Sequence, residues 1–418
     1  MNFSRKNLLM WAIGIGILLP VFFQLNGGIY RGLSVLIDSQ GIVTRLPFPI
    51  SIFACLLAIL LLVGNLNRAV PALVMIAGVV AIGLVSLLFG GDEVTPHQRK
   101  LLVLAQVLLP LGGLVLGSLV HGGSQTIARA FLVVLSIVMP MQLAATWLQG
   151  GLILTHYLYA FTIYAHLQYV SLIFVCAFVF CLSLLWDQHK VWLCVVGVGM
   201  SIYVVSSLSF LTIFAFFAFV FVFIGWKFWS RRSSPGLVAI ASALIVVALA
   251  GSYVYFKKME GQRSSAEGLQ PRYYGKFEDL LAGKVPENVR ERVGDWVLFG
   301  RGIVETKKTL LVGHPQPMPR EIRSSPHNFY IDIAYTFGVV ALLPILGLLA
   351  YTAYLCFKRR QSITVETWWL VAVVFYLVVV DSSFKVTLRQ PYPGIFSYFL
   401  WGILISRLRS PTLFKLQP

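Results

Sequence analysis

Charged residues are scarce in this sequence of 418 residues, because only 12% of them are Asp, Glu, Lys or Arg. A soluble domain carries about 25% charged residues. The hydrophobic share is 58% and the mean hydropathy is +0.82. The apolar runs, of about 18 to 25 residues, suit membrane-spanning helices rather than the shorter alternating strands of a barrel. The sequence therefore predicts an all-α polytopic membrane protein rather than a soluble enzyme.

Cysteines and metal-binding motifs are also few. No cysteine pair sits in a polar loop, so neither a disulfide framework nor a zinc site is predicted. No HExxH, DxD or CxxC pattern occurs, so we expect no metal and no cofactor. The five cysteines all lie in apolar runs, where we expect them to pack: Cys55, Cys176, Cys181, Cys194 and Cys356.

Acidic residues number only 16 against 33 Lys and Arg, which gives a net charge of +17. Cytoplasmic loops enriched in Lys and Arg, together with anionic lipid headgroups, account for such an excess. Nucleic-acid binding would require a basic soluble domain, and none is visible in the sequence. We therefore expect membrane lipids and no nucleic acid as partners.

The hydropathy pattern predicts twelve transmembrane helices. Placing clusters of Lys and Arg on the cytoplasmic side puts both termini there. Spans one to nine occupy 1–256, a large outward loop occupies 257–326, and spans ten to twelve occupy 327–418. The expected spans are 7–26, 46–64, 69–90, 100–120, 126–148, 168–186, 190–206, 209–226, 236–256, 327–357, 366–383 and 392–408.

The loop 257–326 holds thirteen basic and nine acidic residues. Its prolines leave room for two short helices, at 273–283 and 287–300. The second carries apolar residues at helical spacing, including Val289, Val293 and Trp296. We expect this helix to lie on the membrane interface, with Trp296 anchored at the headgroup level.

Arginines are concentrated in this loop without a topological need. Guanidinium binds phosphate oxygens in a bidentate fork and stays charged. At a membrane surface the natural anionic ligand is a lipid-linked phosphate or diphosphate. The alternative is a solvated loop whose arginines contact lipid headgroups. The arginines are Arg263, Arg272, Arg290, Arg292, Arg301, Arg320 and Arg323.

His327 lies between Pro326 and Asn328, where the loop meets the next apolar run. Pro326 suits a helix that begins here. We expect His327 in the first helical turn, where the positive helix end keeps the imidazole neutral and able to accept a proton. Asn328 would orient a substrate hydroxyl. The alternative is a histidine at a helix start with no special task.

Two carboxylates lie near the outer ends of the last spans. A carboxylate at the edge of the bilayer is costly unless it is paired or functional. For Asp381 the alternative to a functional role is a salt bridge to Lys385, one helical turn away. Asp332, in the first turns of span ten, also requires a polar partner.

With these residues placed, the chain resembles the O-antigen ligase and O-antigen polymerase family of bacterial envelope glycosyltransferases. The likeness covers the plan of twelve spans with one large periplasmic loop, and it is strongest over 268–345. His327-Asn328, followed after nine residues by Gly338, is similar to the family signature. The last signature position is usually Gly, Thr or Tyr, and here it is Ala341.

Further positions carry the resemblance. Arg292 with Trp296 is similar to the family's arginine followed four residues later by an aromatic residue, and Arg272-Tyr273 is similar to an earlier pair. Asp381 falls where the family has an aspartate. One position departs, because the outward turn Ser206-Ser-Leu-Ser-Phe210 lacks the family's arginine.

The resemblance implies an inner-membrane glycosyltransferase that uses an undecaprenyl-diphosphate-linked glycan on the periplasmic face, without metal or nucleotide sugar. It implies catalytic roles for His327, Asn328 and Asp381. For the substrate diphosphate, it leads us to expect binding by Arg272, Arg292 and Arg389.

Several activities remain open at this point. If lipid A-core is the acceptor the protein is a ligase, which the His-Asn-x9-Gly spacing slightly favours. If another carrier-linked glycan is the acceptor it is a polymerase. A transporter or flippase of lipid-linked sugars would place charged residues near the midplane of several spans, and these are scarce. A membrane scaffold without activity gives no reason for the residues around His327.

Overall fold

The computed structural model describes residues 5–23, 48–89, 94–120, 122–148, 158–160, 163–165, 169–207, 209–229, 282–285, 287–315 and 325–409. It divides the chain into two compact units, one formed by 1–131 with 292–418 and the other by 132–291. The expected span 236–256, Arg272 and all but the last two positions of the expected helix 273–283 lie outside the described residues.

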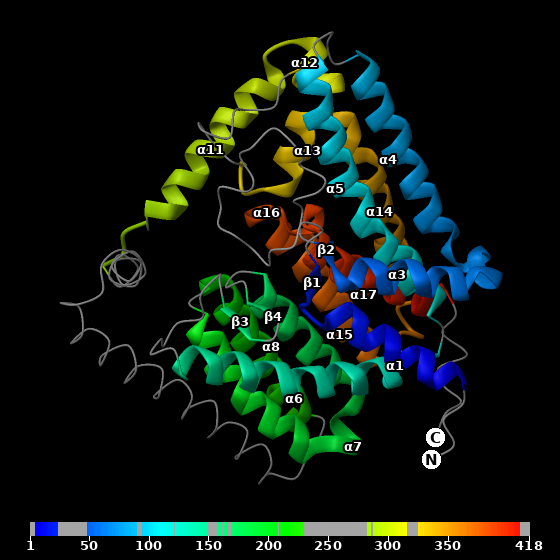
Figure 1. Ribbon diagram of the computed structural model, residues 1–418, viewed down its shortest axis with the longest axis vertical. Coiled ribbons are helices and arrows are strands. Elements are labelled where there is room, and N and C mark those ends of the chain that lie inside the picture. Colours follow the sequence, from blue (N-terminus) through cyan, green and yellow to red (C-terminus); the bar gives the residue numbers. More distant parts are fainter. Residues whose placement is uncertain are drawn as a thin grey trace. The chain divides into compact units, whose positions relative to one another are not determined.

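The first unit is built from helices, with one short ribbon of two strands (Figure 1). Strands β1 (Phe22–Phe23) and β2 (Phe48–Pro49) pair antiparallel. The N-terminal helices are α1 (Arg5–Leu18), α3 (Ile50–Leu61), η2 (Val63–Ala69), α4 (Val70–Phe89) and α5 (Val94–Leu119). The C-terminal helices are α12 (Lys307–Val312), α13 (Phe329–Phe337), η3 (Val339–Leu342), α14 (Leu343–Lys358), α15 (Val365–Phe375), the π-helical turn η4 (Tyr376–Asp381), α16 (Ser382–Phe384), η5 (Thr387–Arg389) and α17 (Pro391–Arg409).

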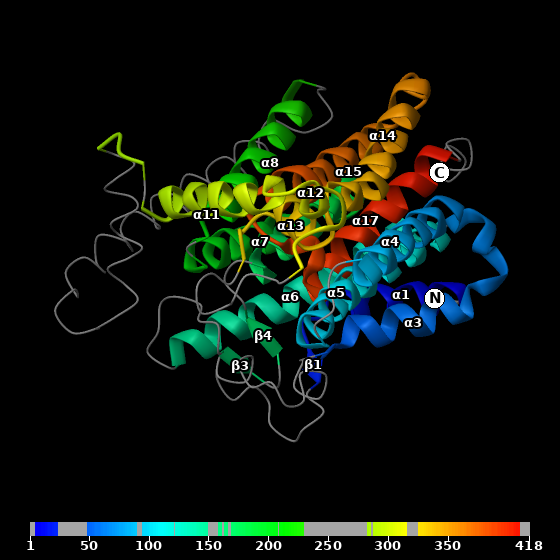
Figure 2. The same cartoon turned by 90° about the horizontal axis from the view of Figure 1, so that it is seen from above.

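Helix α17 forms the core of the first unit. Every residue from Tyr392 to Leu408 is buried, as expected of a helix that is apolar on all sides. It lies along α5 (Figures 1 and 2), and glycines allow the two backbones to approach closely. A Cβ atom at Gly117 would collide with the carbonyl oxygen of Phe399, and one at Gly402 with that of Leu114. Small residues at such crossings are typical of helix packing in membranes.

The second unit contains most of α6 (Ser124–Leu148), the hairpin of β3 (Leu158–Ala160) and β4 (Ile163–Ala165), α7 (Val170–Ser206) and α8 (Phe210–Trp229). Helix α6 packs against the second half of α7. There the hydroxyl of Tyr203 donates to Gln142 Oε1 at 2.5 Å, and Trp192 Nε1 donates to Ser136 Oγ at 2.8 Å.

Helix α7 folds back on itself. His189 has non-helical dihedrals, φ −133° and ψ 39°. The ring centroids of Phe174 and Tyr203 are 5.5 Å apart, whereas a straight helix would separate residues at this spacing by about 40 Å. The segment is therefore two antiparallel arms joined at His189. This confirms the expectation of separate helices at 168–186 and 190–206.

Seven helical segments of the described chain are long and apolar enough to cross a membrane, so the protein is an all-α, multi-pass membrane protein. The segments are Val63–Phe89, Lys100–Leu119, Ser124–Leu148, Val170–Ser206, Phe210–Trp229, Val339–Lys358 and Val365–Phe384. The expected spans 7–26 and 46–64 correspond to the shorter helices α1 and α3, and 392–408 corresponds to α17.

The expected continuous span 327–357 is wrong. Gly338, with φ 86°, separates the short helix α13 from the candidate span Val339–Lys358. A Cβ atom at Gly338 would collide with the carbonyl oxygen of Leu311, and one at Gly313 with that of Thr336. The ends of α12 and α13 therefore meet backbone to backbone, and the chain must leave α13 in a new direction.

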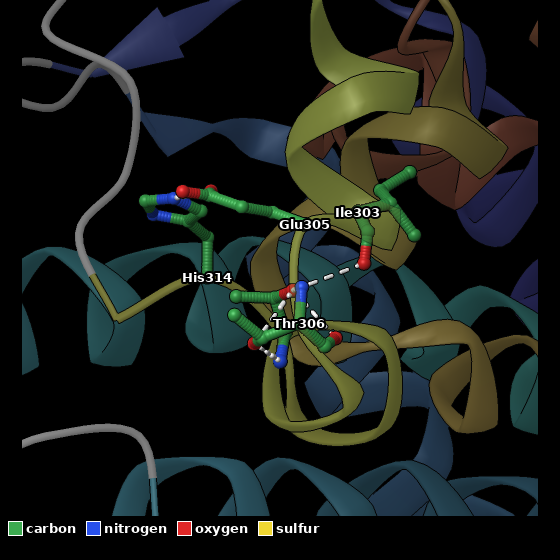
Figure 3. A network of polar contacts seen from close by, with 5 residues as sticks. Ile303, Glu305, Thr306 and His314 are labelled. Carbon is green, nitrogen blue, oxygen red and sulfur yellow. Dashed lines mark hydrogen bonds and ion pairs between the residues drawn. The ribbon is translucent and has the colours of Figure 1, made fainter.

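Helix α11 (Glu287–Val304) leads into α12 and α13, and its observed bounds confirm the expected helix at 287–300 (Figure 2). A capping box starts α12, in which Thr306 Oγ1 accepts from Thr309 N and Thr309 Oγ1 accepts from Thr306 N, both at 3.0 Å. Close by, His314 Nε2 lies 3.3 Å from Glu305 Oε2 (Figure 3). The His314 ring also stacks on Tyr335 of α13, which ties α12 to α13.

Candidate active site

The N-terminus of α13 is capped by Asn328. Its backbone is extended, with φ −145° and ψ 117°, and its Oδ1 accepts hydrogen bonds from Tyr330 N at 3.0 Å and Ile331 N at 3.1 Å. The helix therefore starts at Phe329, and the expectation that His327 lies in its first turn is wrong. The side-chain oxygen of Asn328 is therefore engaged by the helix, and its amide NH2 group takes no part in the cap.

His327 adopts a left-handed backbone conformation, with φ 49°, and is the one non-glycine residue in the described part of the chain with positive φ. This conformation costs about 1–2 kcal/mol, so neighbouring contacts must hold it. His327 N donates to Ser325 Oγ at 3.2 Å, and the preceding carbonyl oxygen of Pro326 accepts from Trp296 Nε1 at 2.9 Å. The residue is half-buried.

Helix α11 contacts two chain segments that carry site residues, the one just before α13 and the one just after η4. Arg292 NH1 donates to the carbonyl oxygen of Phe384 at 3.1 Å, and the ring of Phe384 lies 5.9 Å from that of Trp296. With its bond to Pro326, Trp296 thus bridges the segment before α13 and the segment after η4. The indole N–H of Trp296 is thus bonded within the protein, and its expected placement at the lipid headgroups stays a prediction.

Asp332 and Arg389 form a buried ion pair across 57 residues of sequence. Asp332 N donates to the carbonyl oxygen of the capping residue Asn328 at 3.0 Å, which places the pair one turn below the start of α13. The expectation that Asp332 requires a polar partner is confirmed. Arg389 NH1 is engaged by this pair, whereas its buried Nε has no hydrogen-bond partner among the described residues.

Asp381 is fully buried at the end of η4. Its Oδ1 lies 3.1 Å from Lys385 Nζ, and its Oδ2 accepts a hydrogen bond from Thr387. The salt bridge to Lys385 that the sequence allowed is therefore present. Both carboxylate oxygens hold the turn from η4 to η5, so this geometry assigns Asp381 a positioning role.

Sequence reasoning missed Tyr330. Its hydroxyl donates to the carbonyl oxygen of Val378 in η4 at 2.6 Å. Burial raises the pKa of Tyr330 to about 12, so the hydroxyl stays protonated and remains a donor at neutral pH. The bond ties α13 to the π-helical turn, a kind of irregularity that is frequent at functional sites. The sequence feature that could have indicated this role is the hydroxyl of Tyr330 among the apolar residues at the start of the helix.

The structure thus gathers five of the six expected site residues in one region of the first unit, and the sixth, Arg272, lies outside the described residues. Within each of the two buried ion pairs, Asp332 with Arg389 and Asp381 with Lys385, the opposite charges cancel. Arg292, in contrast, lies on α11 and donates to the carbonyl oxygen of Phe384. We refer to the α13 cluster as Arg292, Trp296, His327, Asn328, Tyr330, Asp332, Asp381, Lys385 and Arg389.

Chemically, the α13 cluster combines a half-buried imidazole with a guanidinium and a buried, unfilled N–H donor. An imidazole exchanges protons near neutral pH, and a guanidinium stabilises phosphate oxygens. Comparisons of the chain with models of known protein families and with curated proteins give no match.

Proposed function

We propose that this protein is a glycosyltransferase of the bacterial inner membrane, which transfers a glycan from an undecaprenyl-diphosphate carrier on the periplasmic face. The observation that carries the proposal is the strained backbone of His327, held by separate contacts from Ser325 and Trp296. Strain of this kind concentrates at functional sites. The plan of twelve spans, with cytoplasmic termini and one periplasmic loop, belongs to the same proposal.

In this reaction an acceptor hydroxyl attacks the anomeric carbon of the glycan. The new bond joins the acceptor oxygen to that carbon, and the bond from the anomeric carbon to the diphosphate oxygen breaks. His327 takes the hydroxyl proton as general base and later returns it to water. The electron pair leaves with the undecaprenyl diphosphate, so the products are the glycoside and the free carrier.

Arg292, together with Arg272, stabilises the charge that builds on the leaving diphosphate. Arg389 contributes through its buried Nε, which would point a third donor at the same anion while Asp332 holds the rest of the side chain. Asn328 positions the acceptor through its amide NH2 group. The ion pair of Asp381 with Lys385 keeps the segment beyond η4 in place.

Lipid A-core is the proposed acceptor, which makes the protein an O-antigen ligase. With a carrier-linked glycan as acceptor, the same cluster performs polymerisation. The two activities differ in what accumulates, because loss of a ligase leaves polymer on the carrier and loss of a polymerase leaves caps of a single repeat.

The test is complementation of a host that lacks its own enzyme, with the lipopolysaccharide separated on a gel. The variants His327→Asn and Arg292→Ala should fail to restore long-chain lipopolysaccharide at normal membrane levels of protein. Arg68→Ala, which changes an exposed arginine far from the α13 cluster in sequence, is the matched control and should restore it. Full restoration by His327→Asn would show that His327 is not the base.

A further inference from the structure

Helix α11 has two apolar faces, and the described residues cover only one of them. Its inner face contains Phe299 and Ile303, which are at most 9% exposed and pack with Ala334 and Tyr335 of α13. Its outer face contains Val289, Val293, Val297 and Val304, which are 41%, 47%, 49% and 68% exposed. The valines of the expected apolar stripe are therefore exposed, whereas Trp296 of the same stripe contacts Pro326.

The four valines form one continuous stripe. Val289, Val293 and Val297 are spaced by four residues, and Val304 follows two turns later, so all four fall on one side of the helix. Over these 15 intervals the stripe extends along about 22 Å of helix. Exposing such a stripe to water would forgo the hydrophobic stabilisation that burial of these valines provides.

Charges border the valine stripe in a fixed order. Arg290 and Arg301 are exposed and lie three helical turns apart, so they follow one edge of the stripe. Glu287 and Glu291 lie further around, and Glu291 points nearly opposite to Val293 because the two are two residues apart. Moving around the helix from the valine stripe, one therefore meets first the two arginines and then the two glutamates.

This order matches the boundary between acyl chains and headgroups in a phospholipid bilayer. Apolar residues enter the acyl region, while arginine side chains reach the phosphates with their stems against hydrocarbon. On a helix surrounded by water, the exposed valines would be unfavourable. A membrane-spanning helix, in turn, would have to bury four charged side chains, those of Glu287, Arg290, Glu291 and Arg301. Helix α11 also lies outside the seven candidate membrane spans of the described chain.

We propose that the outer face of α11 docks on the phospholipid bilayer, with the valine stripe in the acyl region and Arg290 and Arg301 on lipid phosphates. This proposal stands independently of the glycosyltransferase reaction. The same helix contacts Pro326 and Phe384 through Trp296 and Arg292. Docking therefore fixes the position of the segment that carries His327 relative to the lipid.

The test uses full-length protein in bilayer nanodiscs of phosphatidylethanolamine and phosphatidylglycerol, in a background whose five cysteines are replaced by serine. Nitroxide labels are attached in separate samples at Val293→Cys and Glu291→Cys, and their collisions with oxygen and with a water-soluble nickel chelate are compared. The label at position 293 should collide mainly with oxygen, and the matched label at 291 mainly with nickel.

Two outcomes would overturn the proposal. Dominant nickel collisions at both positions would place the valine stripe in water. Protection of position 293 from both reagents would show that another protein segment covers it.

The arginines are tested separately with Arg290→Glu and Arg301→Glu together, read through the label at position 293. Nickel collisions there should rise severalfold in the phosphatidylglycerol-containing bilayer, because anionic phosphates repel the new carboxylates. An unchanged collision ratio would rule out the assigned phosphate contacts. His327 and Arg292 are intact in every sample, so failure of this proposal leaves that of the reaction untouched.

Discussion

The indole nitrogen of Trp296 donates a hydrogen bond to the carbonyl oxygen of Pro326, the residue directly before His327, at 2.9 Å. A side chain of α11 thereby fixes the backbone that presents the proposed base. The same ring contacts Phe384, so one residue spans both segments of the α13 cluster.

The bond from Trp296 predicts that Trp296→Phe keeps the ring contact and loses the positioning of His327. Leaving the Pro326 carbonyl without its donor should lower the free energy of unfolding by about 1–2 kcal/mol. The kcat of glycan transfer should fall while KM changes little, which a loss of folding alone would not produce. Trp368→Phe is the control, because Trp368 is exposed. Equal kcat values for the two variants would contradict the positioning role.

The left-handed backbone at His327 predicts different stabilities for two substitutions. Asparagine tolerates positive φ, whereas alanine is strained there by about 1 kcal/mol. His327→Asn should therefore unfold at a higher temperature than His327→Ala, although both lose the imidazole and should abolish transfer. Thermal unfolding in detergent, followed by a transfer assay, measures both effects. Activity in either variant near the wild-type rate would remove His327 from the mechanism.

The ion pair between Asp332 and Arg389 predicts a large coupling energy. Asp332→Asn or Arg389→Gln alone leaves a buried charge without its partner and should destabilise the protein by about 3–5 kcal/mol. The double variant should be less unstable than the sum of the two losses, as measured in a double-mutant cycle. Transfer activity should stay low in the double variant if Arg389 Nε also binds diphosphate. If the stability losses of the two single variants simply add up in the double variant, the ion pair contributes no coupling energy.

The contact of Gly338 with Leu311 predicts that Gly338→Ala is strongly destabilising. The added Cβ would collide with a backbone carbonyl oxygen at a positive φ, so the loss should exceed about 2 kcal/mol. Gly347→Ala is a matched control within α14, where nothing lies within 4 Å of the added atom. That control should be neutral or slightly stabilising because alanine favours helix. Similar unfolding midpoints for both variants would contradict the tight turn at Gly338.

Burial of Tyr330 predicts a component of stability that disappears in alkali. The pKa of the hydroxyl is raised to about 12 in the folded state, from the ordinary value of 10.0. The folded state therefore favours the protonated hydroxyl, so this contribution is complete below pH 10 and is lost as the pH rises from 10 through 12. The difference in unfolding midpoint between wild type and Tyr330→Phe should shrink over this interval, and a constant difference would contradict the assignment.

Local features of the site were predictable from neighbouring residues. The helix expected at 287–300 extends over Glu287–Val304, because its apolar residues recur at helical spacing after Pro286. The pair of Asp381 with Lys385 follows from residues four apart. Hydropathy also separates the arms of α7, because Asp187-Gln188-His189-Lys190 interrupts the apolar sequence at the bend.

Features that depend on distant residues were not predictable. Asp332 plainly requires a partner, yet no local pattern selects Arg389, which lies 57 residues away. The run from Phe329 to Phe357 is apolar on both sides of Gly338, so hydropathy alone extends one helix through the break. Only the approach of Leu311 shows why a glycine and a turn are needed at that position.

The bend at His189 also decides how crossings of the bilayer are counted. A straight helix over Val170–Ser206 would carry the chain from one side of the membrane to the other. Two antiparallel arms instead return the chain to the side from which it entered. Every segment after Ser206, including the one that bears His327, therefore changes side relative to a count based on helix lengths alone. Whether the number of crossings before Ser206 is odd or even therefore depends on the backbone of this one residue.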